Sequence, residues 1–142
     1  MSSAQPGEAR ALQLPRAIRE AMLQHTRSRP DEEVCGLLGG RDATAGRYYP
    51  VRNIATDPRR KFLMEPGAQI AAMRAMRERG ESLVGIFHSH PDSPAAPSAV
   101  DLALAAYPDT IYVIAAAGGE GPDLNAYYYD GNDFVQVDIH IT

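Results

Sequence analysis

An apolar run that ends in two histidines constrains this chain more than any other feature. Residues 83–87 read Leu-Val-Gly-Ile-Phe, and His88-Ser89-His90 and Pro91 follow directly. The run is short and apolar, so it predicts a buried strand that ends at the proline. Side chains two residues apart lie on the same face of a strand, so both imidazoles converge on one point. Burying two imidazoles at the end of an apolar strand costs free energy unless they bind a partner.

The rest of the chain alternates between apolar runs and segments with helical spacing. Strands are expected at 34–38, 47–54, 62–64, 83–90, 111–116 and in a hairpin within 123–138, and helices at 14–27, 67–79 and 98–107. This alternation predicts an α/β fold with a mixed β-sheet flanked by helices. A length of 142 residues suits one domain. We expect that domain at 13–142, behind a flexible N-terminal tail at 1–12.

Charge and cysteine content exclude several classes of function. The chain has 14 Lys and Arg against 18 Asp and Glu, so its net charge of −4 does not favour nucleic acid or an anionic membrane. The basic cluster Arg59-Arg60-Lys61 is interpreted as a solvated loop. One cysteine excludes a disulfide framework and an all-cysteine metal site. The sequence shows no signal-peptide character and no apolar run of transmembrane length, so a cytoplasmic protein is expected.

Residues downstream of the histidines complete a set of metal ligands. Ser98 and Asp101 stand three residues apart, which puts them on one face of a helix. The proline-rich loop 91–97 can turn that helix back toward His88 and His90. Two histidines and one aspartate make a three-ligand zinc site, and the fourth position is left for a water whose pKa zinc lowers to about 7. The pattern predicts one Zn²⁺ per chain, bound by His88, His90 and Asp101.

A hydrolytic zinc site also needs a general base beside the metal. Glu32 and Glu33 stand immediately before the apolar strand expected at 34–38. If that strand lies beside the strand at 83–90, Glu33 overhangs the water. The prediction of Glu33 as the base depends on this pairing, and the alternative is a solvated acidic pair.

Together, these residues resemble the motif of a known enzyme family. His88-Ser89-His90-Pro91, followed by Pro97-Ser98 and Asp101, is similar to the JAMM motif of the MPN+ (Mov34/MPN/PAD-1) zinc metallopeptidases. That motif includes a glutamate before a strand with Gly-Leu-Leu. Alignment of Gly36-Leu37-Leu38 with this strand selects Glu33 and leaves Glu32 one residue too early. The resemblance implies a single MPN domain with the JAB1/MPN, cytidine-deaminase-like fold.

The resemblance also implies a role for each residue. His88, His90 and Asp101 would bind zinc, and Glu33 would take a proton from the bound water and pass it to the leaving amine. Ser98 would donate a hydrogen bond to the oxyanion. The family cleaves isopeptide or peptide bonds just after the Gly-Gly tail of ubiquitin-like proteins, and glycines let such a tail enter a narrow groove.

Among the family, the chain resembles the short bacterial members. Its loop at 91–97 is too short for the added loops that grip ubiquitin in eukaryotic members. It also carries the segment from Phe62 to Pro66 that precedes the second helix in the bacterial ones. Some of these process ubiquitin-like sulfur-carrier proteins and release whatever is attached after the Gly-Gly tail. A sulfur-carrier protein is the expected partner, while its identity, the released group and the oligomeric state stay open.

Other interpretations share parts of this pattern. Ser98 and Asp101 also fit a helix capping box, which is compatible with catalysis. Cys35 lies in an apolar strand, where a thiol is usually inert, so a nucleophilic role is disfavoured. Alternative functions are a noncatalytic MPN scaffold, a RadC-like DNA-associated protein and a zinc deaminase. The intact ligand set argues against the first, the net charge against the second, and the missing Pro-Cys-x-x-Cys sequence against the third.

Overall fold

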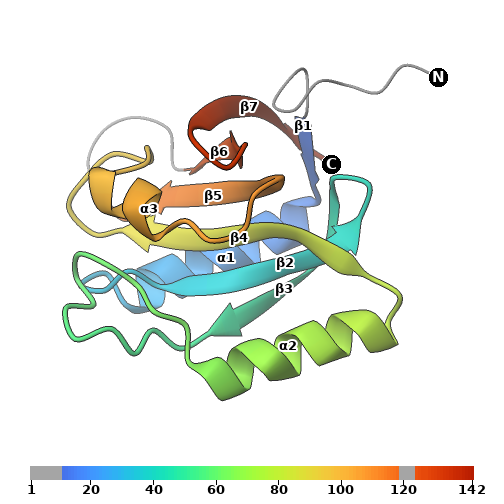
Figure 1. Ribbon diagram of the computed structural model, residues 1–142, viewed down its shortest axis with the longest axis horizontal. Helices are drawn as coiled ribbons and strands as arrows, with labels where there is room; N and C mark the ends of the chain where they lie inside the picture. Colours follow the sequence, from blue (N-terminus) through green and yellow to red (C-terminus); the bar gives the residue numbers. More distant parts are fainter. Residues whose placement is uncertain (1–10, 119–123) are drawn as a thin grey trace.

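The computed structural model describes residues 11–118 and 124–142, which form a curled β-sheet with helices packed against it (Figure 1). The strands are β1 (Ala11–Leu14), β2 (Cys35–Arg41), β3 (Thr44–Val51), β4 (Ser82–His90), β5 (Thr110–Ala116), β6 (Leu124–Tyr129) and β7 (Phe134–Ile141). The helices are α1 (Arg16–Ser28), α2 (Pro66–Glu78) and α3 (Ala99–Leu104). This alternation confirms the predicted α/β class. Within the described residues, no helix combines the length and apolar character that a membrane span requires.

The described strands close into a barrel in the order β1-β3-β2-β4-β5-β6-β7. β1 is parallel to both of its neighbours and β4 is parallel to β5, whereas the other pairs are antiparallel. The sheet is therefore mixed, as predicted. β2 lies between β3 and β4 (Figure 1), which confirms that the strand expected at 34–38 lies beside the strand at 83–90.

The N-terminal strand β1 is the element that the sequence analysis missed. Ala11 and Leu12, which were assigned to the flexible tail, pair in parallel with β7, and Leu12 is completely buried. Leu14 is also buried in this strand, so the first helix begins at Arg16. Four residues are too few to show a strand periodicity, and their partner lies at the other end of the chain. The remainder of the expected tail, residues 1–10, lies outside the described residues.

The strand expected at 62–64 is reduced to a single bridge between Met64 and Asn53. Helix α2 begins immediately afterwards, because Pro66 suits the first helical position and the Glu65 side chain accepts a hydrogen bond from the backbone of the first turn. No length is left for a longer strand. The segment between Asn53 and Met64 instead forms a loop beside the entry to β2, held to it by the backbone hydrogen bond from Glu33 to Pro58.

The central strand β4 is buried on both faces, which explains its continuous apolar sequence. On one face Phe87 packs in a cluster with Met22 of α1. On the other face Ile86 packs in a cluster with Leu37 and with Met76 of α2. Full burial of each such side chain contributes about 1.5–3 kcal/mol to stability. Because β4 ends in the two histidines, the same packing fixes the direction in which their side chains leave the sheet.

Helix α3 is short and begins with a capping box. The Ser98 hydroxyl accepts a hydrogen bond from the backbone N–H of Asp101 at 3.0 Å, and the Asp101 carboxylate accepts one from the backbone N–H of Ser98 at 2.9 Å. The capping interpretation is therefore confirmed. The helix ends at Leu104, earlier than expected, because the Tyr112 hydroxyl accepts the backbone N–H groups of the extended segment that follows.

Candidate metal centre

The site is built on the C-terminal end of β4, where this strand runs parallel to β5. His88 and His90 lie on the same face of the strand, as their spacing predicts, and are 1% and 2% exposed. Their Nε2 atoms lie 3.2 Å apart. The ring of Phe62 stacks on His88 with 4.6 Å between the centroids, which restricts the rotation of that imidazole. Both imidazoles therefore present Nε2 to one point.

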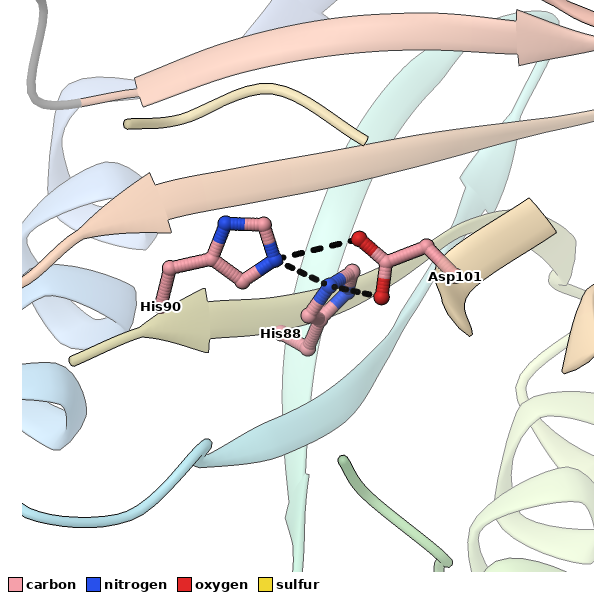
Figure 2. Close-up of side chains that lie close together, drawn as sticks. All are labelled: His88, His90 and Asp101. Atoms are coloured by element: carbon pink, nitrogen blue, oxygen red, sulfur yellow. Dashed lines mark hydrogen bonds and ion pairs between the residues drawn. The ribbon is translucent and has the colours of Figure 1, made fainter. Parts of the chain in front are cut away.

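Asp101 approaches this point from the first turn of α3 (Figure 2). Its Oδ1 lies 3.1 Å from His88 Nε2, and its Oδ2 lies 3.1 Å from His90 Nε2. One ligand atom from each of the three residues lies within 4.8 Å of the other two. The structure therefore brings together the three side chains that the sequence analysis predicted as metal ligands.

The arrangement of these atoms fits a cation. His90 Nδ1 lies 2.8 Å from the carbonyl oxygen of Pro94 and donates to it, so a neutral ring carries its lone pair on Nε2. That lone pair faces an Asp101 oxygen and the Nε2 atom of His88. Several hydrogen-bond acceptors therefore lie close together without enough donor hydrogens between them, which is electrostatically unfavourable. A divalent cation removes this conflict. Two imidazole nitrogens and a carboxylate oxygen are a donor set typical of zinc.

The pKa values of the three residues follow from burial and from their contacts. Burial disfavours the charged ring and lowers the pKa of His88, even though Asp101 opposes the shift. Burial acts in the same direction on His90, but the hydrogen bonds to Asp101 and Pro94 outweigh it and raise that pKa. Burial alone would raise the pKa of Asp101, yet the hydrogen bonds from the two histidines hold it well below its usual range. Asp101 is therefore ionised at neutral pH, as a metal ligand must be.

Glu33 reaches the site from the entry of β2. Cys35 pairs with His88 across β2 and β4, and Glu33 lies two residues before Cys35. The register of β2 and β4, continued by the hydrogen bond from the Ser89 N–H to the Val34 carbonyl, puts Glu33 opposite His90. The residue is 3% exposed, and its Oε1 has no hydrogen-bond partner within the described part of the chain. Burial raises the pKa of this carboxyl to about 8.

Glu32 and Ser98 differ from Glu33 in their exposure. Glu32 is partly exposed and forms an ion pair with Arg29 at 3.2 Å, so only the second of the two adjacent glutamates enters the buried site. Ser98 is exposed at the start of α3. Its oxygen accepts the N–H of Asp101, which leaves the hydroxyl hydrogen available as a donor.

A mostly apolar groove of about 220 Å³ begins at Asp101. Its walls come from residues within 61–64 and 100–107. Two of these wall residues, Leu63 and Leu104, are 58% and 59% exposed. An apolar groove that ends at a few convergent polar groups is the usual form of a substrate site. A ligand in this groove would therefore contact Asp101.

Two neighbours of the ligands have structural roles. Ser89, between the histidines, accepts a hydrogen bond from the backbone N–H of Val34 at 2.9 Å and donates one to the Glu32 carbonyl. The sequence analysis missed this contact, although a hydroxyl in an apolar strand signals that a partner is required. Cys35 donates to the Val51 carbonyl and is fully buried, and burial raises its pKa to about 12. Such a thiol is unsuited to be a nucleophile.

Similar proteins are found over most of the chain. The family model for prokaryotic homologs of the JAB domain matches residues 15–129. A desampylase of Haloferax volcanii is 32% identical over 136 residues, which are 92% of this chain and 96% of that protein. A CysO-cysteine peptidase of Mycobacterium tuberculosis is 35% identical over 96 residues, which are 66% of this chain and 65% of that protein.

Solved structures share the same architecture. The solution structure of a protein from Desulfitobacterium hafniense is 35% identical, has a TM-score of 0.82, and covers 92% of each chain. The crystal structure of a JAB1/MPN domain protein from Archaeoglobus fulgidus is 18% identical and has a TM-score of 0.58, over 91% of this chain and 96% of the other. These likenesses confirm the predicted MPN fold.

Proposed function

This chain belongs to the prokaryotic JAB-domain family, and from that premise we propose that it is a zinc-dependent JAMM-type peptidase or isopeptidase. Its substrate is a ubiquitin-like or sulfur-carrier protein, and the bond cleaved is the amide that follows the C-terminal Gly-Gly tail. One observation carries this proposal. Three potential ligand atoms, from His88, His90 and Asp101, converge next to Glu33, a buried carboxyl whose Oε1 has no partner among the described residues.

Each side chain has one chemical task in this proposal. His88, His90 and Asp101 would hold zinc, which would supply a Lewis acid that lowers the pKa of a water molecule. Glu33 takes a proton from that water as the oxygen attacks the amide carbon. Ser98 donates its hydroxyl hydrogen to the carbonyl oxygen as negative charge develops there. When the C–N bond breaks, Glu33 returns the proton to the leaving amine. The products are a carboxylic acid and an amine, which become a carboxylate and an ammonium group at neutral pH when the acid proton passes to the amine.

The pKa of Glu33 suits a residue that must both accept and release a proton. A carboxyl with an ordinary pKa near 4.3 is a weak base at neutral pH. In the metal-free chain burial raises the pKa of Glu33 to about 8, and the positive charge of a bound zinc ion would lower it from there toward neutral pH. General acid–base catalysis is most efficient when the pKa lies near the operating pH. The unpartnered carboxyl therefore supports catalysis better than a noncatalytic scaffold, which has no use for it.

The groove supports a glycine-rich tail as the substrate. It is mostly apolar, it begins at Asp101, and its lining comes from several separate segments of the chain. Glycine has no side chain, so two consecutive glycines pass where other residues would clash. The names of the two relatives, a desampylase and a CysO-cysteine peptidase, agree with a small protein conjugate as substrate. We also place the enzyme in the cytoplasm, because a free thiol such as that of Cys35 is typical of reducing compartments.

A release assay tests the proposal. The purified chain is incubated with a sulfur-carrier protein that carries a peptide extension after its Gly-Gly tail, and the products are read by mass spectrometry. We expect cleavage after the second glycine with zinc present and no cleavage after chelation. A matched substrate with both glycines replaced by valine should stay intact. Equal cleavage of both substrates, or cleavage that survives chelation, would show that the proposal is wrong.

A further inference from the structure

The backbone of Glu33 is held at both of its polar atoms by one loop. Its N–H donates to the carbonyl oxygen of Pro58 at 2.7 Å, and its carbonyl oxygen accepts a hydrogen bond from Asn53 Nδ2 at 2.9 Å. Strand β2 begins only at Cys35, so Glu33 lies outside the ladder that fixes the rest of the strand. These contacts with the loop that runs from Asn53 to Leu63 therefore set where the Glu33 backbone lies.

Asn53 also holds the loop itself together. Its Nδ2 donates to the carbonyl oxygen of Lys61 at 3.0 Å, and its Oδ1 accepts the N–H groups of Ala55 and Leu63, both at 2.9 Å. A side-chain amide offers two donor hydrogens and two acceptor lone pairs. All four are used here, and they join the first residues of the loop to its last ones and to Glu33.

The same loop forms one wall of the groove. Lys61 and Leu63, whose backbones Asn53 holds, both line it. The donor side of the Asn53 amide faces the carbonyls of Glu33 and Lys61, while the acceptor side faces Leu63. One side chain thus connects the candidate base with the wall along which the substrate tail would lie.

We propose that Asn53 is the positioning residue for Glu33: its amide fixes the backbone of the base relative to the groove. This inference rests on the proposed function, because it gives Asn53 a part in catalysis that acts through Glu33. A general base that is displaced by about 1 Å loses on the order of 100-fold in rate. Asn53 contacts neither the metal ligands nor, in this proposal, the substrate, so its effect should appear in kcat and not in zinc affinity.

Asn53→Asp is the informative variant. It is isosteric and keeps both acceptor contacts, with Ala55 and Leu63, but an ionised carboxylate cannot donate to the carbonyls of Glu33 and Lys61. We expect kcat for release of the extension to fall about 10- to 100-fold. KM and the Kd for zinc should stay within about twofold of the wild-type values. Asn132→Asp makes the same change in the exposed turn between β6 and β7 and should leave all three values unchanged.

Hydrogen exchange in the metal-free chain gives a readout that does not depend on activity. In Asn53→Asp the amide of Glu33 should exchange about tenfold faster than in the wild type, while the amide of Ser89, bonded to Val34 within the sheet, should keep its rate. If Asn53→Asp does not fold, Asn53→Ser, which retains one donor, is measured in the same way and should give a smaller change in the same direction.

The outcomes separate this inference from the proposed function. If the wild-type chain releases nothing, the proposed function is wrong, and exchange at Glu33 alone decides whether Asn53 holds it. If the wild type is active but kcat of Asn53→Asp is unchanged, the positioning role is overturned. It is also overturned if KM rises or zinc affinity falls as kcat falls, or if exchange accelerates equally at Glu33 and Ser89, because each result indicates a general loosening of the fold.

Discussion

Two buried acidic residues, Asp101 and Glu33, lie on either side of the same pair of histidines, and they differ in their hydrogen bonds and in their pKa. At the start of α3, the Asp101 carboxylate faces the Nε2 atoms of both imidazoles at 3.1 Å and accepts a hydrogen bond from the backbone N–H of Ser98. At the entry of β2, the Oε1 atom of Glu33 has no partner in the part of the chain that the structure describes. The pKa of Asp101 is held below its usual range, whereas burial raises the pKa of Glu33 to about 8.

The difference shows how one kind of residue is given two tasks. Donors around a carboxyl stabilise its ionised form, which a metal ligand needs at all times. Burial without donors destabilises the ionised form, so the carboxyl can exchange a proton near neutral pH. Pairs of acids whose environments push their pKa values apart mark the division between fixed charge and proton transfer. In the proposed function the fixed charge would be Asp101 and the group poised for proton transfer would be Glu33.

Glu33→Gln should give the largest effect, because it removes the proton acceptor and keeps the shape of the side chain. We expect the rate of release to fall about 10²- to 10⁴-fold, the range that a general base contributes. The Kd for zinc should change by less than about twofold, and competition with a chromophoric chelator measures it. If the variant kept more than a tenth of the wild-type rate, Glu33 would not be the general base.

Asp101→Ala should instead lower the affinity for zinc, and should lower the rate of hydrolysis only as a consequence. Structural zinc sites contribute about 10–16 kcal/mol over four ligands, so one ligand is worth roughly 3–4 kcal/mol. Zinc affinity should therefore fall about 10²- to 10³-fold, and hydrolysis should return only with excess zinc. Asp101→Asn, which keeps the volume and loses the charge, serves as the matched variant. Zinc binding as tight as in Glu33→Gln would contradict the role of Asp101 as a ligand.

Acid should weaken zinc binding in two stages. In the metal-free protein His90 has a raised pKa and takes up a proton first, near or above the usual value of about 6.5, while His88 has a lowered pKa and follows in more acidic solution. Each bound proton competes with the metal, so the affinity should fall by about tenfold per pH unit at first and more steeply later. Titrations from pH 8 to pH 4 measure this. Undiminished affinity at pH 4 would rule out the histidine ligands.

The smallest expected effect is a gain in stability of the metal-free Glu33→Gln chain. The pKa of Glu33 is about 8 in the folded chain and about 4.3 when unfolded, so above pH 4.3 ionisation favours the unfolded state. The penalty grows up to pH 8 and is absent at pH 4. Glutamine removes it, so in the presence of chelator the variant should have a higher Tm than the wild type at pH 8 and the same Tm at pH 4. If the wild type and the variant had the same Tm at pH 8 as well as at pH 4, folding would not raise the pKa of the Glu33 carboxyl.

The sequence predicts the chemistry of this site better than the path of the chain around it. His88, His90 and Asp101 could be named because their spacing alone fixes their directions along a strand and a helix. The choice of Glu33 over Glu32 came from the resemblance to the JAMM motif, and its place beside the histidines needed the pairing of β2 with β4, which the structure confirms. Asn53 left no signal, because its partners are backbone atoms between Glu33 and Leu63 that no side-chain pattern reveals.

The first strand shows the same limit at the level of the fold. β1 is only four residues long, and its partner β7 begins more than 100 residues later. The register of β1 depends on contacts that form when the whole sheet closes. Local periodicity in the sequence therefore does not predict this strand. Burial of Leu12 and Leu14 becomes visible only once that closure is known.

Helix α3 has six residues, too few to persist as a helix by itself. Its first turn is closed by Asp101, the same residue that faces the two histidines. Metal binding and the folding of this turn are therefore coupled, and each stabilises the other by the same free energy. Because α3 also provides part of the groove wall, this one turn joins the ligand cluster to the groove, and a metal held by Asp101 would stabilise both.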